Sequence, residues 1–235
     1  MINTKHMSRT LASLPIVAVA LIGLHAVGQE HDAGRLELAQ SDEAMSSGRF
    51  QLGTHYDRLS PVQPTSSGPE QIEVAEIFWY GCPHCYTFDP YLESWKEDLA
   101  ADVSFVRVPA VWNPLLQLHA RAFYAAEVLG IADDVHTPIF REIHVNGNPL
   151  NSEQALQGFF EQFGVSAEDF SGAFNSFAVH TRLQRADELS RRYRISSVPT
   201  VIVNGKYSAS ASSAGDYPTL MELIDELVAS ERAGE

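Results

Sequence analysis

The two cysteines of this 235-residue chain, Cys82 and Cys85, are its only ones, and they follow directly on an apolar run that ends at Gly81. Residues 77–80 have the pattern of a strand end, and the pattern after Cys82 is helical. This order places Cys82 at a helix N-terminus, where unpaired peptide N–H groups and the helix dipole stabilise a thiolate. Pro83 would occupy the first helical position, where its missing N–H costs nothing.

A single Cys-x-x-Cys is also compatible with half of a zinc site or with a structural disulfide. A zinc site needs four ligands, so the others would have to come from the nine histidines. Four histidines lie downstream without forming a closely spaced pair: His119, His136, His144 and His180. A disulfide that closes so short a loop adds little stability. Redox chemistry is therefore favoured, and a zinc-binding interaction module stays open as an alternative from another class of function.

The N-terminal residues 1–28 have the pattern of an export signal. Lys5 and Arg9 precede an uncharged apolar stretch over residues 11–27, which ends among small residues. Export implies an oxidising compartment, in which a thiol pair can be kept as a disulfide. Because the apolar stretch is nearly long enough to span a bilayer, an uncleaved N-terminal membrane anchor is the alternative.

The chain is acidic, with a formal net charge of −14 that becomes −16 when the two basic residues of the signal are removed. A surface of this charge is poorly suited to nucleic acid or to anionic lipid. Residues 29–52 contain several acids and little hydrophobic periodicity, which predicts a flexible acidic linker. The Pro- and Ser-rich residues 59–69 predict an extended arm.

Residues 72–80 form the first predicted strand, with apolar side chains on both faces. This pattern is typical of a central strand that is covered by helices on each side. Glu76 interrupts the run. A solvated carboxylate is the default reading of a strand Glu, but a central strand has no wet face, so we expect Glu76 to be buried close to the cysteines.

The remaining chain alternates between strand and helix signals. Residues 103–108 predict a second strand, and the pattern from residue 114 to residue 194 is helical almost throughout. Strand signals return over residues 198–203, after which Asn204-Gly205 predicts a hairpin turn. A Ser- and Gly-rich loop to residue 215 and a final helix over residues 217–230 complete the prediction of an α/β fold.

Several of these segments together resemble one family. The matching residues are Glu76, separated by five residues from Cys82-Pro83-His84-Cys85-Tyr86, then Val198-Pro199-Thr200 and Val203-Asn204-Gly205-Lys206-Tyr207. This combination resembles the DsbA-type periplasmic disulfide oxidoreductases. The resemblance implies an α/β thioredoxin fold with an inserted helical domain. Residues 53–112 and 184–235 would form the thioredoxin-like domain, and residues 113–183 the insertion.

The resemblance also implies roles for individual residues. Cys82 would be the exposed nucleophile and Cys85 the buried resolving thiol. Pro199 resembles the cis-proline beside the disulfide, and Val198 would offer its backbone to a bound peptide by strand-like pairing. Glu76 matches the buried acid that helps to move protons at Cys85. In its cationic form, His84 (in the Cys-Pro-His-Cys motif) would further stabilise the Cys82 thiolate.

The implied activity is the introduction of disulfide bonds into reduced exported proteins in the periplasm, through a redox-active Cys82–Cys85 disulfide and without another cofactor or a metal. A monomer and a quinone-linked membrane partner of the DsbB type, which reoxidises the pair, are further implications. A disulfide isomerase or reductase is the alternative within redox chemistry. Isomerases of the DsbC type carry a sizeable N-terminal dimerisation domain, for which residues 29–52 are too few.

Overall fold

The computed structural model describes residues 48–234, so the predicted export signal and most of the predicted linker lie outside the described residues. Within this range one mixed sheet has the strand order β1-β5-β4-β2-β3. Its strands are β1 (Tyr56–Arg58), β2 (Ile72–Phe78), β3 (Val103–Pro109), β4 (Thr200–Val203) and β5 (Tyr207–Ala209). Because β2 pairs in parallel with β3 and antiparallel with β4, it is the central strand that was predicted.

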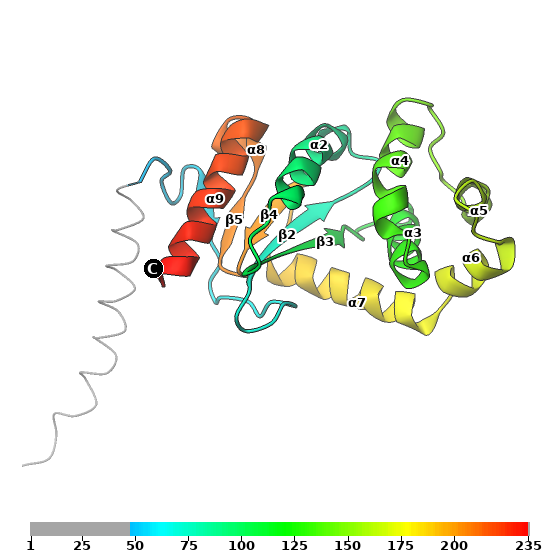
Figure 1. Ribbon diagram of the computed structural model, residues 1–235, viewed down its shortest axis with the longest axis horizontal. Helices are drawn as coiled ribbons and strands as arrows, with labels where there is room; N and C mark the ends of the chain where they lie inside the picture. The colour runs from blue at the N-terminus through cyan, green and yellow to red at the C-terminus, as the bar shows by residue number, and fades with distance from the viewer. Residues whose placement is uncertain (1–47, 235) are drawn as a thin grey trace, which may run out of the picture. The chain divides into compact units, whose positions relative to one another are not determined.

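Helices cover both faces of this sheet. One face carries α2 (Pro83–Glu97), α8 (Ala211–Ala214) and α9 (Tyr217–Ala233), which lie above the strands in Figure 1. The other helices are α3 (Pro114–Leu129), α4 (Ala132–His144), α5 (Glu153–Glu161), α6 (Ala167–Phe174) and α7 (Phe177–Arg192). α7 passes below the strands toward the group formed by α3 to α6 (Figure 1). The arrangement is a thioredoxin fold with a helical insertion.

The apolar side chains of β2 are divided between two cores. Val74 packs with residues of α2 and α9, whereas Ala75 and Ile77 pack with residues of α3 and α7. All seven residues of β2 are buried, as expected for a central strand. Since successive strand residues point to opposite faces, Glu76 points to the same face as Val74, which is the face that α2 covers.

The structure differs from the prediction in two short elements. Residues 56–58 form the edge strand β1. This strand has only three residues, two of them charged, so its sequence shows no strand pattern. The loop predicted before residue 215 contains the single-turn helix α8, which begins at a capping box between Ser210 and Ser213. Both elements are too short to produce a hydrophobic period.

Two predicted boundaries differ from the structure. The flexible linker was expected to extend to residue 52, but Phe50 is only 3% exposed and belongs to the core beneath α9. The packed part of the described chain therefore begins before that expected boundary. The expected end of the helical insertion at residue 183 falls inside α7, which runs without interruption from Phe177 to Arg192.

The predicted hairpin turn is present and also holds the extended arm. Asn204 and Gly205 have φ angles of 51° and 62°, as a two-residue hairpin turn requires. The backbone N–H of Gln63 donates to the Gly205 carbonyl at 2.9 Å. A Cβ atom at Gly205 would lie 2.0 Å from the Gln63 carbonyl oxygen, so only glycine permits this approach.

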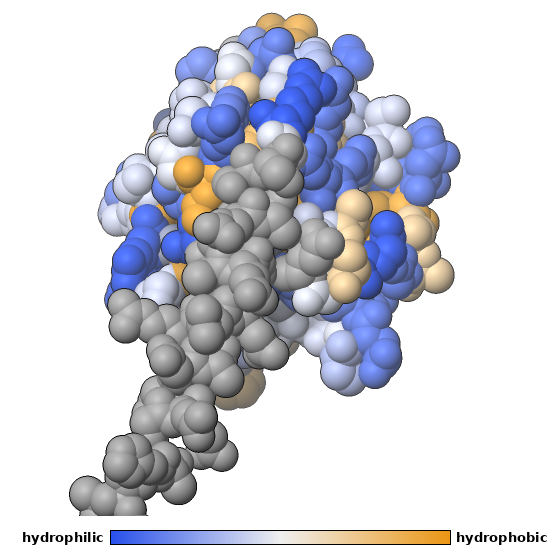
Figure 2. Space-filling view, turned by 90° about the vertical axis from the view of Figure 1, so that its left-hand side faces the viewer, coloured by the Kyte–Doolittle hydropathy of each residue, from blue (hydrophilic) through white to orange (hydrophobic). Residues whose placement is uncertain are grey.

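The surface seen from the side of α9 is mostly hydrophilic, and hydrophobic side chains occur there in small patches (Figure 2). Within residues 48–234, no helix combines the length and the apolar character needed to cross a bilayer.

Candidate active site

Cys82 is the N-cap residue of α2, and its backbone is extended with φ −87° and ψ 118°. Its sulfur accepts a hydrogen bond from the backbone N–H of Cys85 at 3.4 Å, which satisfies one of the unpaired N–H groups of the first turn. Pro83 begins the helix, as predicted. Both cysteines are free thiols in this structure, so the geometry is that of the dithiol form.

The surroundings of Cys82 favour its ionised form. A hydrogen bond from the Cys85 thiol makes the largest contribution, and the backbone N–H groups of Cys85 and His84 add to it, as does the His84 charge. Together they lower the pKa of Cys82 to about 6, although burial acts in the opposite direction. Cys82 is only 7% exposed, so its thiol is less accessible to solvent than the family resemblance implied.

Cys85 lies one residue beyond His84 and has the opposite character. Its side chain is 0% exposed. Burial raises the pKa of Cys85 far above its ordinary value, and the hydrogen bond to Cys82 and the charge of Glu76 raise it further. The pair therefore consists of one thiol that ionises below neutrality and one that keeps its proton.

The chain returns to the cysteines at the start of β4. The Cys82 Sγ–H donates to the backbone carbonyl of Val198 at 3.5 Å, across 116 residues of sequence. The Val198–Pro199 peptide bond is cis, as the family resemblance implies. Pro199 is buried and Val198 is half-buried. A backbone carbonyl thus lies directly beside the reactive sulfur.

Glu76 is 1% exposed and lies beneath α2, so the solvated reading of this residue is wrong. Arg107 stands opposite it on β3 and donates from Nε to Glu76 Oε2 at 3.1 Å. The same guanidinium contacts Glu93 at 2.6 Å and Asp89 at 3.4 Å. Burial raises the pKa of Glu76 to about 7, even though Arg107 acts to lower it.

A buried histidine, His136, extends this charge cluster, and from the sequence it was considered only as a possible zinc ligand. A hydrogen bond of 3.0 Å joins His136 Nδ1 to the Tyr80 hydroxyl. His136 Nε2 lies 3.3 Å from Asp89 Oδ1 without the alignment of a hydrogen bond. Burial lowers the pKa of His136 to about 4, and the Arg107 charge adds to this, so the imidazole is neutral at pH 7. No sequence signal marks this histidine, because its partners come from two other elements.

Two other histidines of the insertion hold the residues that follow β2 in place. The Trp79 indole N–H donates to His119 Nδ1 at 3.0 Å, and His144 Nε2 donates to the Tyr80 carbonyl at 2.8 Å. The indole ring lies over Gly81, where a Cβ atom would come within 2.2 Å of it. The glycine before Cys82 is therefore required by the packing of Trp79.

Three of the four histidines that were weighed as zinc ligands, His119, His136 and His144, thus have other partners. Among residues 48–234, no group of three or more His, Cys, Asp or Glu side chains is arranged to hold a metal ion.

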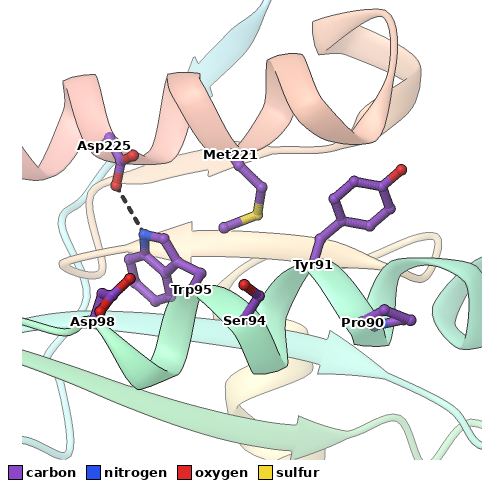
Figure 3. Close-up of a pocket in the computed structure, with 7 residues that line it drawn as sticks. All are labelled: Pro90, Tyr91, Ser94, Trp95, Asp98, Met221 and Asp225. Atoms are coloured by element: carbon purple, nitrogen blue, oxygen red, sulfur yellow. Dashed lines mark hydrogen bonds between the residues drawn. The ribbon is translucent and has the colours of Figure 1, made fainter.

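A cleft of about 570 Å³ lies between α2 and α9 (Figure 3). Its lining residues are Pro90, Tyr91, Ser94, Trp95, Asp98, Met221 and Asp225. One wall is fixed by the Trp95 indole N–H, which donates to Asp225 at 2.8 Å. Neither cysteine lines this cleft, so it lies beside the redox pair and does not contain it.

Comparisons with known proteins agree with this geometry. Residues 102–225 match the family of DSBA-like thioredoxin domains. A thiol:disulfide interchange protein DsbA of Pseudomonas aeruginosa is 39% identical over 195 residues, which are 83% of this chain and 89% of that protein. The protein of the same name from Pseudomonas syringae pv. tomato is 35% identical over 227 residues, 97% of each chain.

Solved structures show the same likeness. The crystal structure of Pseudomonas aeruginosa DsbA is similar with a TM-score of 0.75 and 39% identity, over 79% of this chain and 96% of that one. The oxidoreductase DsbA from Xylella fastidiosa gives a TM-score of 0.72 and 36% identity, over 76% and 96%.

The difference between the two thiols predicts an asymmetric reaction with an alkylating reagent. In the reduced protein, the alkylation rate at Cys82 should be half-maximal near pH 6 and close to its plateau at pH 7, because the thiolate is the reacting species. Cys85 should stay unmodified over the same range. Mass spectrometry of peptides after brief alkylation at pH 5 to 8 measures both rates.

The same protein unfolded in urea is the control, since both thiols should then react alike and only at more alkaline pH. Equal rates at Cys82 and Cys85 in the folded protein would contradict the assignment of one reactive and one protected thiol.

Proposed function

This chain belongs to the DsbA family of thiol:disulfide oxidoreductases, and we propose that it introduces disulfide bonds into reduced exported proteins through Cys82 and Cys85. The observation that carries the proposal is the position of Cys82. Its sulfur lies at the N-terminus of α2 with a pKa of about 6, and Cys85 is buried behind it. A thiolate that is stable in the reduced form makes the corresponding disulfide a strong oxidant.

The first step begins with the oxidised protein. A thiolate of the substrate attacks the Cys82 sulfur, forms a mixed disulfide and breaks the bond between Cys82 and Cys85. The electron pair of that bond passes to the Cys85 sulfur. Because its pKa in this site is far above neutrality, Cys85 takes up a proton.

In the second step, another thiolate of the substrate attacks the substrate's own sulfur in the mixed disulfide. Cys82 leaves as a thiolate, and its low pKa makes it a good leaving group. The substrate has then lost two electrons and two protons and carries a disulfide. The protein has gained both electrons. One proton resides on Cys85, and the other is in solution.

Glu76 is suited to supply the proton that Cys85 needs. Its charge acts on Cys85, and burial raises its pKa to about 7, close to the pH at which the reaction runs. A proton donor is most effective when its pKa matches the working pH. The other carboxylates around Arg107 support this role. The charges of Asp89 and Glu93 raise the pKa of Glu76, because they disfavour a further negative charge there.

The backbone at Val198 is suited to hold the substrate. Its carbonyl lies 3.5 Å from Cys82 Sγ and precedes the first residue of β4, so an extended peptide can pair with it while its sulfur reaches Cys82. Pro199 fixes the chain direction at this point. The cleft between α2 and α9 is separate from this backbone contact.

The remaining parts of the proposal rest on the family resemblance and the sequence. The protein acts in the periplasm as a monomer, uses the cysteine pair as its only redox group, and is reoxidised by a quinone-linked membrane protein of the DsbB type. The exporting segment, residues 1–28, precedes the described residues. Disulfide isomerisation or net reduction by the same pair is the alternative activity.

The equilibrium of the cysteine pair with glutathione tests the direction of the reaction. We expect a potential less negative than about −180 mV, together with rapid oxidation of a reduced peptide that contains two cysteines. A potential below about −230 mV, with fast reduction of insulin and no peptide oxidation, would assign the protein to the reductases instead.

Replacement of the buried acid tests proton delivery. Glu76→Gln should fold, since the amide keeps the shape of the side chain, and should slow formation of the mixed disulfide about tenfold near pH 7. The wild-type rate should also change near pH 7, where Glu76 titrates, and the variant should lose this dependence. Stopped-flow fluorescence from pH 5 to pH 9 measures both.

Glu93→Gln is the matched control, because Glu93 shares Arg107 with Glu76 but is 38% exposed. If Glu76→Gln keeps the wild-type rate and pH profile, Glu76 does not move the proton.

Stability in the two redox states tests the thiolate itself. The pKa of Cys82 is about 6 in the folded protein and 9.0 ordinarily, so the stabilisation of the reduced form is complete above pH 9 and is lost as the pH falls through 6. At pH 8 the thiolate stabilises the folded reduced form by about 2.7 kcal/mol. The disulfide stabilises the folded oxidised form by about 1.9 kcal/mol, because it closes only a short loop. Urea unfolding should therefore show the reduced form to be the more stable at pH 8 and the oxidised form at pH 6.

His84→Ser should narrow the difference at pH 8, because the His84 charge contributes to the low pKa of Cys82. A difference between the redox states that does not change from pH 6 to pH 8 would refute a folded-state thiolate.

A further inference from the structure

The first residue of α9, Tyr217, reaches the dipeptide between the two cysteines. Its hydroxyl donates a hydrogen bond to the backbone carbonyl of His84 at 3.1 Å. The same oxygen lies 3.5 Å from His84 Nδ1. The contact joins two segments that are 133 residues apart in sequence. The Tyr217 side chain thus contacts both the backbone and the imidazole of His84.

Tyr217 is held firmly from both sides. It follows the N-cap Asp216, whose carboxylate accepts from the Thr219 N–H at 2.7 Å. Its ring stacks on Phe88 with centroids 5.3 Å apart and an interplanar angle of 21°. Phe88 is fully buried in α2. The position of the hydroxyl is therefore set by two packed helices and does not depend on a mobile side chain.

His84, in contrast, is exposed and depends on such contacts for its orientation. A carbonyl oxygen can only accept, so the single proton of the Tyr217 hydroxyl is committed to the His84 backbone. The hydroxyl oxygen then presents a lone pair toward His84 Nδ1. It can accept an N–H from that nitrogen, which fixes the orientation of the ring.

The redox pair and Tyr217 also interact electrostatically. Burial raises the pKa of Tyr217, and the negative charge of the Cys82 thiolate raises it further. The phenol consequently stays protonated at neutral pH and remains a donor to the His84 carbonyl. Tyr91, whose ring centroid is 5.7 Å away, is the other titratable group that acts on it.

We propose that Tyr217 is a positioning residue of the redox site, which holds His84 through its backbone and its imidazole so that His84 stabilises the Cys82 thiolate. The proposal rests on the thiol:disulfide exchange proposed above. It assigns to the first turn of α9 a share in setting how strongly the disulfide oxidises.

The substitution Tyr217→Phe tests this, since it removes the hydroxyl and keeps the ring that stacks on Phe88. Loss of one such hydrogen-bonding group should lower the equilibrium constant for oxidation by the pair about threefold, which corresponds to about 14 mV. The sign follows from the weaker stabilisation of the reduced form. The pH of half-maximal thiolate absorbance should rise by about 0.5 for the same reason.

Tyr91→Phe is the matched control, because it removes a neighbouring hydroxyl for which the described residues show no hydrogen bond to His84. It should leave the glutathione equilibrium and the thiolate titration unchanged. In a His84→Ser background, Tyr217→Phe should have less than half of its effect, since the imidazole on which it acts is gone. A residue that served stability alone would shift the urea midpoint equally in both redox states and leave the potential unaltered.

The outcomes separate the two proposals. If the wild-type pair is reducing, the proposed oxidase function fails whatever Tyr217 does. If the wild type is oxidising but Tyr217→Phe matches it in potential and titration, the role of Tyr217 is refuted while the function stands. An equal effect of Tyr91→Phe, or an undiminished effect in the His84→Ser background, would also refute it.

Discussion

The hydrogen bonds around the Cys82 sulfur are the interaction on which the rest of the structure depends. A thiolate is stable there because α2 begins at that atom, so that the N–H groups of the first turn and the helix dipole act on the sulfur. The tight junction between β2 and α2 requires Gly81, which in turn is required by the indole of Trp79. A shift of the helix start by one residue would direct the N–H groups away from the sulfur and remove the driving force for oxidation.

Beneath α2, a second constraint arises from charge. One guanidinium, Arg107, serves three carboxylates, of which Glu76 and Asp89 are almost completely buried and Glu93 is partly exposed. In a low dielectric, one cation cannot compensate three anions, so one acid holds its proton at a higher pH than usual. Glu76 is that acid, with a pKa of about 7, and its charge acts on the protected Cys85.

The helical insertion does more than enlarge the molecule. Its residues His119, His136 and His144 all make hydrogen bonds to Trp79 or Tyr80, the two residues that follow β2. The segment immediately before the redox pair is thereby tied to helices on one side, while α9 contacts the motif from the other through its first residue. Such support from two separate parts of the chain keeps the N-terminus of α2 in a fixed geometry.

The sequence by itself determined what depends on neighbouring residues: the helix start at Cys82 and Pro83, the burial of β2 on both faces, and the hairpin turn before β5. These features follow from backbone preferences and hydrophobic period within a few residues, and a recognised motif added the thioredoxin fold and the cis peptide before Pro199. Only the tertiary structure decided which distant groups meet. The contact of Glu76 with Arg107 spans 31 residues and that of Cys82 with Val198 spans 116. These contacts depend on strand register and on the docking of helices, which no local pattern encodes. Many strand and helix pairings satisfy the same hydrophobic period, and only the packing of the whole core selects one of them.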